Sequence, residues 1–240
     1  MSKIKSYVSS VDGRWGKCYY IKDDEYVGKS LKNYGEYNPD ETEFILALAA
    51  ERGGLILDIG ANIGTITQAL VHNGYHVAAF EPQKALFDIL ELNAGDRADL
   101  YNVALGEKAG TTRMPKVQYH VRGNFGGISC GSGEIEVPLR TLDSYQFNNV
   151  GLIKLDVEGF EEYVLRGGLN TILDSKPWIY LEADRAEKIP YLKHYVTEVL
   201  KYSWVEHQPT LYRENNYFGK KVNVWAPMNF ASHNVLCKPL

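Results

Sequence analysis

Cysteine is scarce in this chain: Cys18, Cys130 and Cys237 are the only three among 240 residues. They are far apart and odd in number, so they show neither a disulfide framework nor the paired spacing of a metal site. Cysteines kept as thiols are typical of a reducing compartment. The sequence therefore predicts a cytoplasmic protein in which the cysteines are packing residues.

Long apolar runs and an excess of positive charge are lacking as well. The longest apolar run, residues 44–50, is far shorter than the ~20 residues that a membrane-spanning helix needs. Residues 1–10 are polar and lack the apolar core of a secretion signal. A net charge of −4 disfavours an electrostatic grip on nucleic acid. We therefore expect no membrane span and no nucleic-acid partner.

Apolar residues make up 45% of the chain, which is enough for one sizeable core. Residues 1–40 are rich in tyrosine and glycine and end at a turn-and-cap signal, residues 38–40. We predict an N-terminal extension over 1–40, packed on a single catalytic domain over 41–240. The oligomeric state is left open.

Strands alternate with helices along the predicted domain. Strands are expected over 55–59, 76–80, 99–103, 135–139, 152–155 and 178–181, and helices over 41–51, 65–72, 84–93, 160–166 and 189–202. Residues 108–134 are predicted to form an irregular glycine-rich insertion, and residues 204–206 and 234–237 to pair antiparallel at the end. This alternation predicts an α/β protein with a mostly parallel, doubly wound sheet that is covered on both faces.

A glycine turn links the first strand of this sheet to its helix, in residues 57–64 (LDIGANIG). Gly60 and Gly64 allow the backbone to approach a ligand at the helix start, and Asn62 either holds the loop or contacts the ligand. Glu81 follows the second strand and can accept hydrogen bonds from both hydroxyls of a ribose. Because the pyrophosphate fingerprint Gly-x-Gly-x-x-Gly is missing, S-adenosylmethionine fits better than NAD.

Acidic residues follow four predicted strands, at one rim of the sheet. They are Asp58, Glu81, Asp156 and Glu182. In parallel sheets a ligand binds outside the carboxyl ends of the strands. This agreement among four strands predicts the site more strongly than any single motif.

Residues 154–159 (KLDVEG) place Lys154, Asp156 and Glu158 on one side of an extended segment. These side chains are candidates for catalysis, with Asp156 also a candidate cofactor contact, or they form a structural ion-pair cluster. Glu182 and Asp184 share a side at the next strand end. Glu182 is a further catalytic candidate, or the pair is an Asp-capped helix start with a salt bridge. A divalent cation such as Mg²⁺ or Mn²⁺, if present, would be held by Asp156, Glu182 and Asp184.

His207 is the alternative general base, because the pKa of histidine lies near neutrality. The other histidines show no ligand spacing: His72, His76, His120, His194 and His233. Residues 124–129 (NFGGIS) are either a lid or wall of the cofactor site, or a plain surface turn.

The chain resembles the FkbM family of S-adenosylmethionine-dependent methyltransferases. The matching blocks are residues 57–64, 79–82, 102–106, 141–143 and 154–159 continuing to Glu161, and a bacterial subgroup shares residues 31–37, 124–129, 180–185 and 232–239. The resemblance implies a class I methyltransferase fold, which is Rossmann-like, with seven strands and an antiparallel last strand. It implies cofactor contacts at Asp58, Gly60, Asn62, Gly64, Glu81, Asn102 and Val103.

The resemblance also implies O-methylation of a sugar or polyketide hydroxyl. One departure is Glu206, where similar sequences often place Trp before the histidine, and we expect it to affect the substrate pocket. Our hypothesis is an O-methyltransferase acting on a small-molecule or glycan hydroxyl. The alternatives are a non-sugar acceptor, a catalytically inactive binding module, and an NAD-linked oxidoreductase, which would need the missing pyrophosphate loop.

Overall fold

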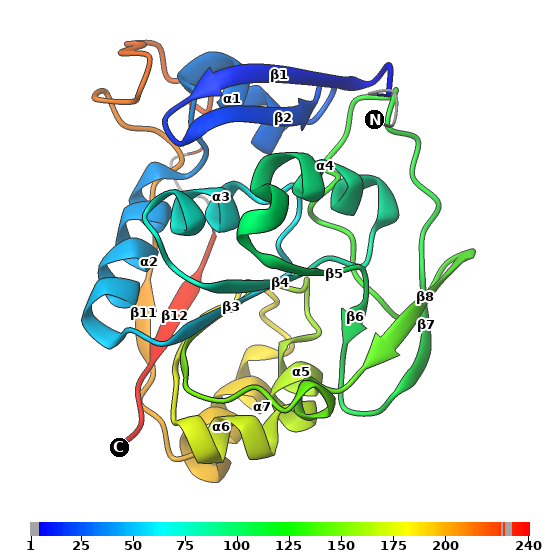
Figure 1. The fold of residues 1–240 in the computed structure, drawn as a ribbon, viewed down its shortest axis with the longest axis vertical. Coiled ribbons are helices and arrows are strands. Elements are labelled where there is room, and N and C mark those ends of the chain that lie inside the picture. The colour runs from blue at the N-terminus through cyan, green and yellow to red at the C-terminus, as the bar shows by residue number, and fades with distance from the viewer. Residues whose placement is uncertain (1–4, 227, 229–231) are drawn as a thin grey trace.

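The computed structural model describes residues 5–226, 228 and 232–240. Its centre is a seven-stranded sheet in the order β11-β12-β10-β9-β3-β4-β5 (Figure 1). The strands are β3 (Leu55–Ile59), β4 (Val77–Phe80), β5 (Asp99–Tyr101), β9 (Val150–Leu155), β10 (Trp178–Glu182), β11 (Val205–His207) and β12 (Asn234–Cys237). The five strands from β10 to β5 are parallel, and β12 is antiparallel to both β10 and β11. The predicted sheet and its antiparallel last strand are confirmed.

Helices cover both faces of this sheet (Figure 1). On one face lie α2 (Pro39–Arg52), α3 (Thr65–His72) and α4 (Lys84–Ala94), and on the other α5 (Glu161–Gly167), α6 (Leu169–Ser175) and α7 (Ile189–His194). Each helix turns an apolar stripe onto the strands, such as Ile45 and Leu48 of α2. The strands are buried on both faces, which explains their nearly continuous apolar sequences.

One predicted helix differs from the structure, and one observed helix was not predicted. The helix expected over 189–202 is α7 followed by a π-helical turn, η3 (Tyr195–Val199), and the backbone leaves the helical region at Lys201, where φ is 59°. Helix α6 was not predicted, because its cap is distant in sequence. Asp143 accepts hydrogen bonds from the first-turn N–H groups of Asn170 and Thr171, at 3.1 and 2.8 Å.

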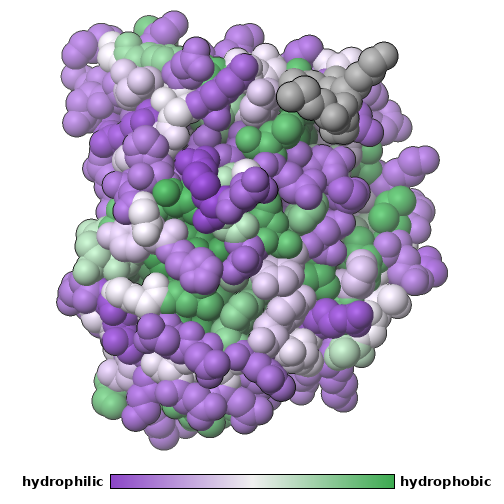
Figure 2. Space-filling view, in the orientation of Figure 1, coloured by the Kyte–Doolittle hydropathy of each residue, from purple (hydrophilic) through white to green (hydrophobic). Residues whose placement is uncertain are grey.

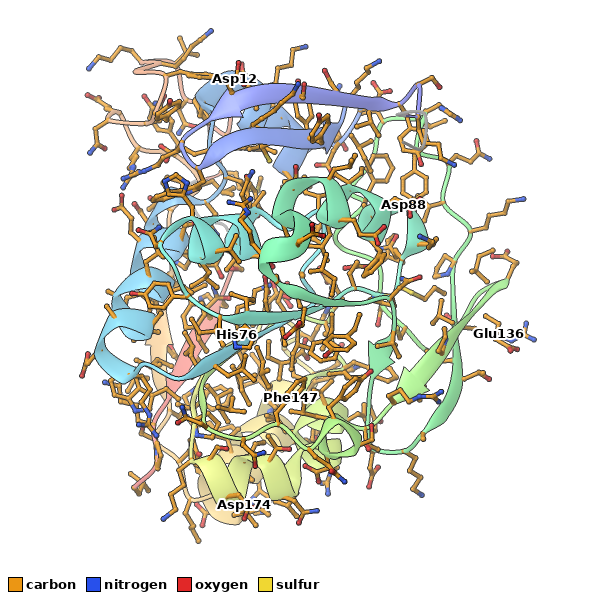
Figure 3. The ribbon with its side chains drawn as sticks, viewed as in Figure 1. Asp12, His76, Asp88, Glu136, Phe147 and Asp174 are labelled. Atoms are coloured by element: carbon orange, nitrogen blue, oxygen red, sulfur yellow. The ribbon has the colours of Figure 1, made fainter. Side chains whose placement is uncertain are left out.

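The insertion over 108–134 is not wholly irregular, so that prediction is wrong in part. Strand β7 (Gly110–Met114) pairs antiparallel with β8 (Ile135–Arg140), and β8 pairs in parallel with β6 (Ala104–Leu105). These strands form a separate small sheet beside the main one, and Glu136 of β8 lies at its outer surface (Figures 1 and 3). Strand β7 is mostly exposed, so its sequence lacked the apolar alternation that marks a half-buried strand.

The N-terminal extension has secondary structure that was not predicted. Strands β1 (Val8–Gly13) and β2 (Gly16–Ile21) form a hairpin, followed by α1 (Val27–Tyr34). The hairpin lies over α4 (Figure 1), where Asn93 bonds to the N–H and C=O of Tyr19 at 2.6 and 2.9 Å. Residues 1–4 of the extension lie outside the described part. The division at residue 40 stays a prediction.

Aromatic side chains cover the β5 edge of the sheet. Tyr101 of β5 stacks on Phe80 at 4.8 Å between ring centroids and packs against Tyr145 at 4.9 Å. Apolar side chains gather in the middle of the face in Figure 2, and Phe147 is labelled below β5 in Figure 3. Among the described helices, none has the length and apolar character of a membrane span.

Candidate active site

A cavity of about 400 Å³ opens at the carboxyl ends of β3, β4, β9 and β10. Parallel sheets of this type bind ligands at that rim. The predicted site residues that line it are Gly60, Asn62, Glu81, Val103, Lys154, Asp156, Glu158, Glu182 and Asp184. Four others do not line it: Asp58, Gly64, Asn102 and His207. Most of the predicted site is therefore brought together in one cavity.

Asp58 is fully buried in β3, directly beside Lys154 of β9 in the strand register. The Thr67 hydroxyl donates to Asp58 at 2.6 Å, and Lys154 Nζ lies 3.7 Å from its other oxygen. Lys154 Nζ also contacts Asp156 Oδ2 at 3.3 Å and donates to the Gly60 carbonyl at 3.2 Å. Asp58 thus supports the rim from inside the core, beside Lys154, and its predicted cofactor contact stays a prediction.

The charge of Lys154 is held by its surroundings. Burial alone lowers the pKa of this ammonium, but the nearby Asp156, Asp58 and Glu41 carboxylates together raise it above its usual value. Lys154 therefore stays protonated, and we interpret it as the counter-ion of the rim carboxylates.

Close contacts favour glycine at both positions of the turn, Gly60 and Gly64. Gly60 has a φ of +82°, and a Cβ there would lie 1.7 Å from the carbonyl oxygen of Asp156. Gly64 has a φ of +83°, and a Cβ there would lie 2.4 Å from Leu90 Cδ1 of α4. Gly60 therefore lets the β3 and β9 ends approach, and Gly64 lets α3 approach α4. A cofactor contact stays a prediction for both residues.

Glu81 is buried at the end of β4, with both carboxylate oxygens directed at backbone donors. The N–H of Asn62 donates to one oxygen at 3.0 Å and the N–H of Gln83 to the other at 2.7 Å. Burial raises the pKa of Glu81 to about 7. Asn102 Nδ2 donates to the carbonyls of Glu81 and Pro82, at 2.8 and 3.1 Å, so it shapes the turn that carries Glu81. Each carboxylate oxygen keeps a second lone pair that can accept from a hydroxyl.

Three carboxylates converge beside Lys154. Oxygens of Asp156, Glu158 and Glu182 lie within 4.8 Å of one another. Arg185 pairs with Glu158, whereas one Glu182 oxygen is buried without a hydrogen-bond partner. Burial and the Asp156 charge raise the pKa of Glu158 to about 7, and the same two causes raise the pKa of Glu182 well above its usual value. The group therefore favours an added proton or cation.

Asp184 lies in the cavity wall but outside this group of three. Its carboxylate is 3.7 Å from Arg185 Nε.

The turn that carries Glu158 is shaped by Glu161, whose carboxylate accepts from the N–H groups of Val157 at 3.2 Å and Gly159 at 3.0 Å. Hydrogen bonds from this segment to Glu161 thus stabilise the turn formed by the end of the KLDVEG motif.

His207 lies outside the cavity lining. Its Nδ1 is 2.8 Å from the Tyr180 hydroxyl, and its ring packs on Phe44 at 4.3 Å between centroids. Burial lowers the pKa of His207. A role as general base stays a prediction that this placement does not favour. His76, which had no predicted role, lies at the amino end of β4 and pairs with Asp99 at 3.0 Å, away from the cavity (Figure 3).

Several lining residues were not predicted, and Glu41 is the most prominent. It is 8% exposed, in the first turn of α2, and Tyr37 and Asn38 line the cavity beside it. The sequence did carry one signal: Glu41 precedes the buried Ile45 and Leu48 by four and seven positions, so it lies on the buried face of the helix. Burying a carboxylate on such a face is costly unless hydrogen bonds or a charged partner compensate it, so this position indicates a specific role.

Residues 124–129 form part of the cavity wall. Asn124, Gly126, Gly127 and Ile128 line it, and Cys130 follows them. The segment is anchored by Phe125, which is buried against α4 and whose carbonyl accepts from Gln83 Nε2 at 3.0 Å. The structure therefore supports a fixed wall over a plain surface turn.

The stability of the ligand-free protein is expected to fall as pH rises from 4.5 to about 7. Glu41 and Glu81 have folded-state pKa values of about 7, raised by burial from 4.5. The folded state holds their protons in this window, so their stabilisation is complete below pH 4.5 and is lost as pH passes 7. Each contributes a slope of up to about 1.4 kcal/mol per pH unit.

Urea unfolding of Glu41→Gln and the wild type between pH 4.5 and 8 measures this. The variant should gain stability relative to the wild type as pH rises. Glu43→Gln is the control, because Arg213 lowers the pKa of Glu43 and no such gain is expected. A constant difference between Glu41→Gln and the wild type would contradict the assignment.

The family model described as the methyltransferase FkbM domain matches residues 58–218, more than half of the chain. A methyltransferase FkbM from Methylobacillus flagellatus KT has a similar fold, with a TM-score of 0.52 at 17% identity. That alignment covers 77% of this chain but 44% of the other, so this chain spans less than half the length of that relative.

An S-adenosylmethionine-dependent O-methyltransferase from Thermotoga maritima aligns at 12% identity with a TM-score of 0.49, over 97% of this chain and 77% of that one. No curated protein matches significantly. The family match covers the glycine turn, the rim carboxylates and the wall over 124–129. The chain therefore belongs to the FkbM family of methyltransferases.

Proposed function

We propose that the protein transfers a methyl group from S-adenosylmethionine to a hydroxyl oxygen, on a sugar or glycan. The observation that carries the proposal is one cavity that holds both Glu81 and the Asp156, Glu158 and Glu182 group, in a methyltransferase domain. Glu81 is suited to a ribose, and the acidic group to a cation or a hydroxyl. A cytoplasmic location is part of the proposal and rests on the cysteine usage.

The residues present fit S-adenosylmethionine. Glu81 would accept the ribose hydroxyls, and Phe80, Val103 and Leu105 supply an apolar wall for the adenine ring. When bound, the donor supplies a methyl group on a positively charged sulfur. Carboxyl groups outnumber basic groups in the described lining, with Glu41, Glu81, Asp156, Glu158, Glu182 and Asp184 against Lys154 and Arg185. This excess favours a cationic ligand.

The rest of the lining supports a hydroxyl acceptor. Tyr26 and Tyr37 come from the N-terminal extension and offer rings against which a sugar face can pack. Carboxylates accept hydrogen bonds from neighbouring hydroxyls. The extension is therefore proposed as part of the site. A non-sugar hydroxyl is the second acceptor class, and convergence of three carboxylates argues against an inactive binding module.

A divalent cation on Asp156, Glu158 and Glu182 is a second proposal for this group. The all-oxygen donor set and the unpartnered Glu182 oxygen favour a hard cation. Lys154 already pairs with Asp156, and Arg185 with Glu158. A proton shared by Asp156 and Glu182 is the alternative to a cation for neutralising the charge that remains. A bound cation would lower the pKa of an acceptor hydroxyl.

Calorimetric titration with S-adenosylhomocysteine, with and without Mg²⁺ or Mn²⁺, tests both proposals. We expect micromolar binding by the wild type and roughly hundredfold weaker binding by Glu81→Gln, since two hydrogen bonds to a charged group are weakened. If metal raises the affinity for S-adenosylhomocysteine and Glu182→Gln abolishes this increase, the cation is supported. If the wild type binds S-adenosylhomocysteine equally well in excess EDTA and in the presence of metal, the cation is excluded.

Release of S-adenosylhomocysteine in the presence of a panel of methyl glycosides then tests the acceptor class. Turnover of a glycoside supports O-methylation of a sugar. Absence of S-adenosylhomocysteine binding by the wild type would overturn the proposed function.

A further inference from the structure

Glu41 is a carboxylate of the cavity that comes from outside the matched segment 58–218. One oxygen accepts from Asn234 Nδ2 of β12 at 3.0 Å, and the other accepts from Asn38 Nδ2. Both partners are buried neutral amides. The carboxylate is therefore oriented from two sides without an ion pair.

The other cavity carboxylates are held differently. Lys154 contacts Asp156, and Arg185 pairs with Glu158. Glu81 accepts two backbone N–H groups. A cation in direct contact stabilises the carboxylate form, and the position of Glu81 assigns it to the proposed ribose. Among the described residues, the direct partners of Glu41 are neutral amides, and Lys154 acts on it only from a distance. No cation therefore has to be displaced when Glu41 takes a proton.

Asn234 is fixed in the orientation that serves Glu41. Its Nδ2 also donates to the Tyr180 hydroxyl at 2.7 Å, and its Oδ1 accepts from the Ser232 hydroxyl at 3.0 Å. The Tyr180 hydroxyl in turn lies 2.8 Å from His207 Nδ1. A chain of hydrogen bonds therefore links His207 to Glu41 through Tyr180 and Asn234. His207 helps to orient Glu41 from outside the cavity lining.

We infer that Glu41 is the general base that accepts the proton of the acceptor hydroxyl, an inference that rests on the proposed function. As the proton passes from the hydroxyl oxygen to the Glu41 carboxylate, that oxygen bonds to the methyl carbon. The carbon–sulfur bond breaks, and its electron pair stays on sulfur as a neutral thioether. The proton then leaves Glu41 for solvent.

Two further observations support this role. Burial raises the pKa of the Glu41 carboxyl to about 7, although Lys154 lowers it, and a base works best when its pKa lies near the working pH. Tyr37, which lines the same wall, is one of the rings proposed to pack against the acceptor. Glu41 thus lies beside the proposed acceptor subsite.

Sinefungin tests the inference without knowledge of the acceptor. This analogue carries an ammonium group where S-adenosylmethionine carries its transferable methyl, whereas S-adenosylhomocysteine carries nothing there. If Glu41 faces the methyl position, the wild type binds sinefungin at least tenfold more tightly than S-adenosylhomocysteine, because a charge-assisted contact contributes about 1.5–3 kcal/mol. Glu41→Gln should lose most of this preference and keep its S-adenosylhomocysteine affinity within about twofold.

Glu43→Gln is the matched control, since Glu43 lies two residues away on α2 and faces Arg213 at the surface. It should keep both affinities. An unchanged sinefungin preference in Glu41→Gln, or equal loss of both ligands, would overturn the role of Glu41 and leave the proposed function standing. Failure of the wild type to bind either ligand would overturn the proposed function, and this inference with it.

Methyl transfer to a methyl glycoside provides a kinetic readout. Glu41→Gln should lower kcat by about 10²- to 10⁴-fold with a KM close to the wild type. The fall of kcat/KM on the acid side of pH 7 should disappear in the variant. A wild-type pH profile retained in Glu41→Gln would assign the base elsewhere.

Discussion

Gly60→Ala is expected to lower the free energy of unfolding by about 2–5 kcal/mol, or to prevent folding. The Cβ would lie 1.7 Å from the Asp156 carbonyl oxygen, where no side-chain rotation can relieve the clash. A left-handed backbone costs an L-residue about 1–2 kcal/mol, and overpacking costs about 1–3 kcal/mol more. Urea unfolding, followed by circular dichroism, measures the loss.

Gly74→Ala separates the two causes. Gly74 has a nearly equal positive φ, +83°, but a Cβ there would have no neighbour within 4 Å. Its substitution should cost only the backbone part, about 1–2 kcal/mol. Equal losses in the two variants would show that the contact between the β3 and β9 ends does not require a glycine at position 60.

Lys154→Met is expected to destabilise the protein by about 3–5 kcal/mol at pH 8, the cost of removing one partner from a buried ionic group. The ammonium contacts Asp58, Asp156 and the Gly60 carbonyl. Without it, the carboxylates must either stay charged and unpaired or take up protons. The loss should therefore shrink at pH 5, where protons are available.

Lys84→Met is the control for Lys154→Met. Lys84 is an exposed lysine of α4 that pairs with Asp88, one turn along the helix (Asp88 is labelled in Figure 3). Exposed pairs contribute about 0–1 kcal/mol, so this variant should unfold almost as the wild type does. A similar small effect for Lys154→Met at pH 8 would show that the rim carboxylates do not depend on Lys154.

Local patterns were sufficient for the core elements. Helix α3 has the predicted bounds, 65–72, and strand β3 the predicted bounds, 55–59. The hairpin β1–β2 and α1 were missed. Helix α1 does carry a helical period, since the buried Val27, Leu31 and Tyr34 are spaced i, i+4 and i+7. The partners of this unit on α4 and Phe125 are distant in sequence.

The candidate site likewise has a part that was predictable from local sequence and a part that was not. Asp156 and Glu158 follow a buried strand, so their place at its carboxyl end was predictable. The extended segment expected for them is wrong: β9 ends at Leu155 and Glu158 has a φ of +55°. A turn therefore brings the two carboxylates together.

The placement of Glu41 was not predictable, because it depends on where α2 crosses the sheet and on Asn234, which is 193 positions away. The exclusion of His207 from the lining likewise depends on the order of β10, β12 and β11.

The parallel sheet, the rim of acidic residues and the family likeness could be predicted, because they follow from short-range periodicity and contiguous motifs. The fold was needed to show which carboxylates are paired with cations, which are held by neutral amides and which side chains face the cavity. Those properties arise from contacts between segments distant in the chain. They depend on burial, which sets the charge state of each group and which no local pattern of residues specifies.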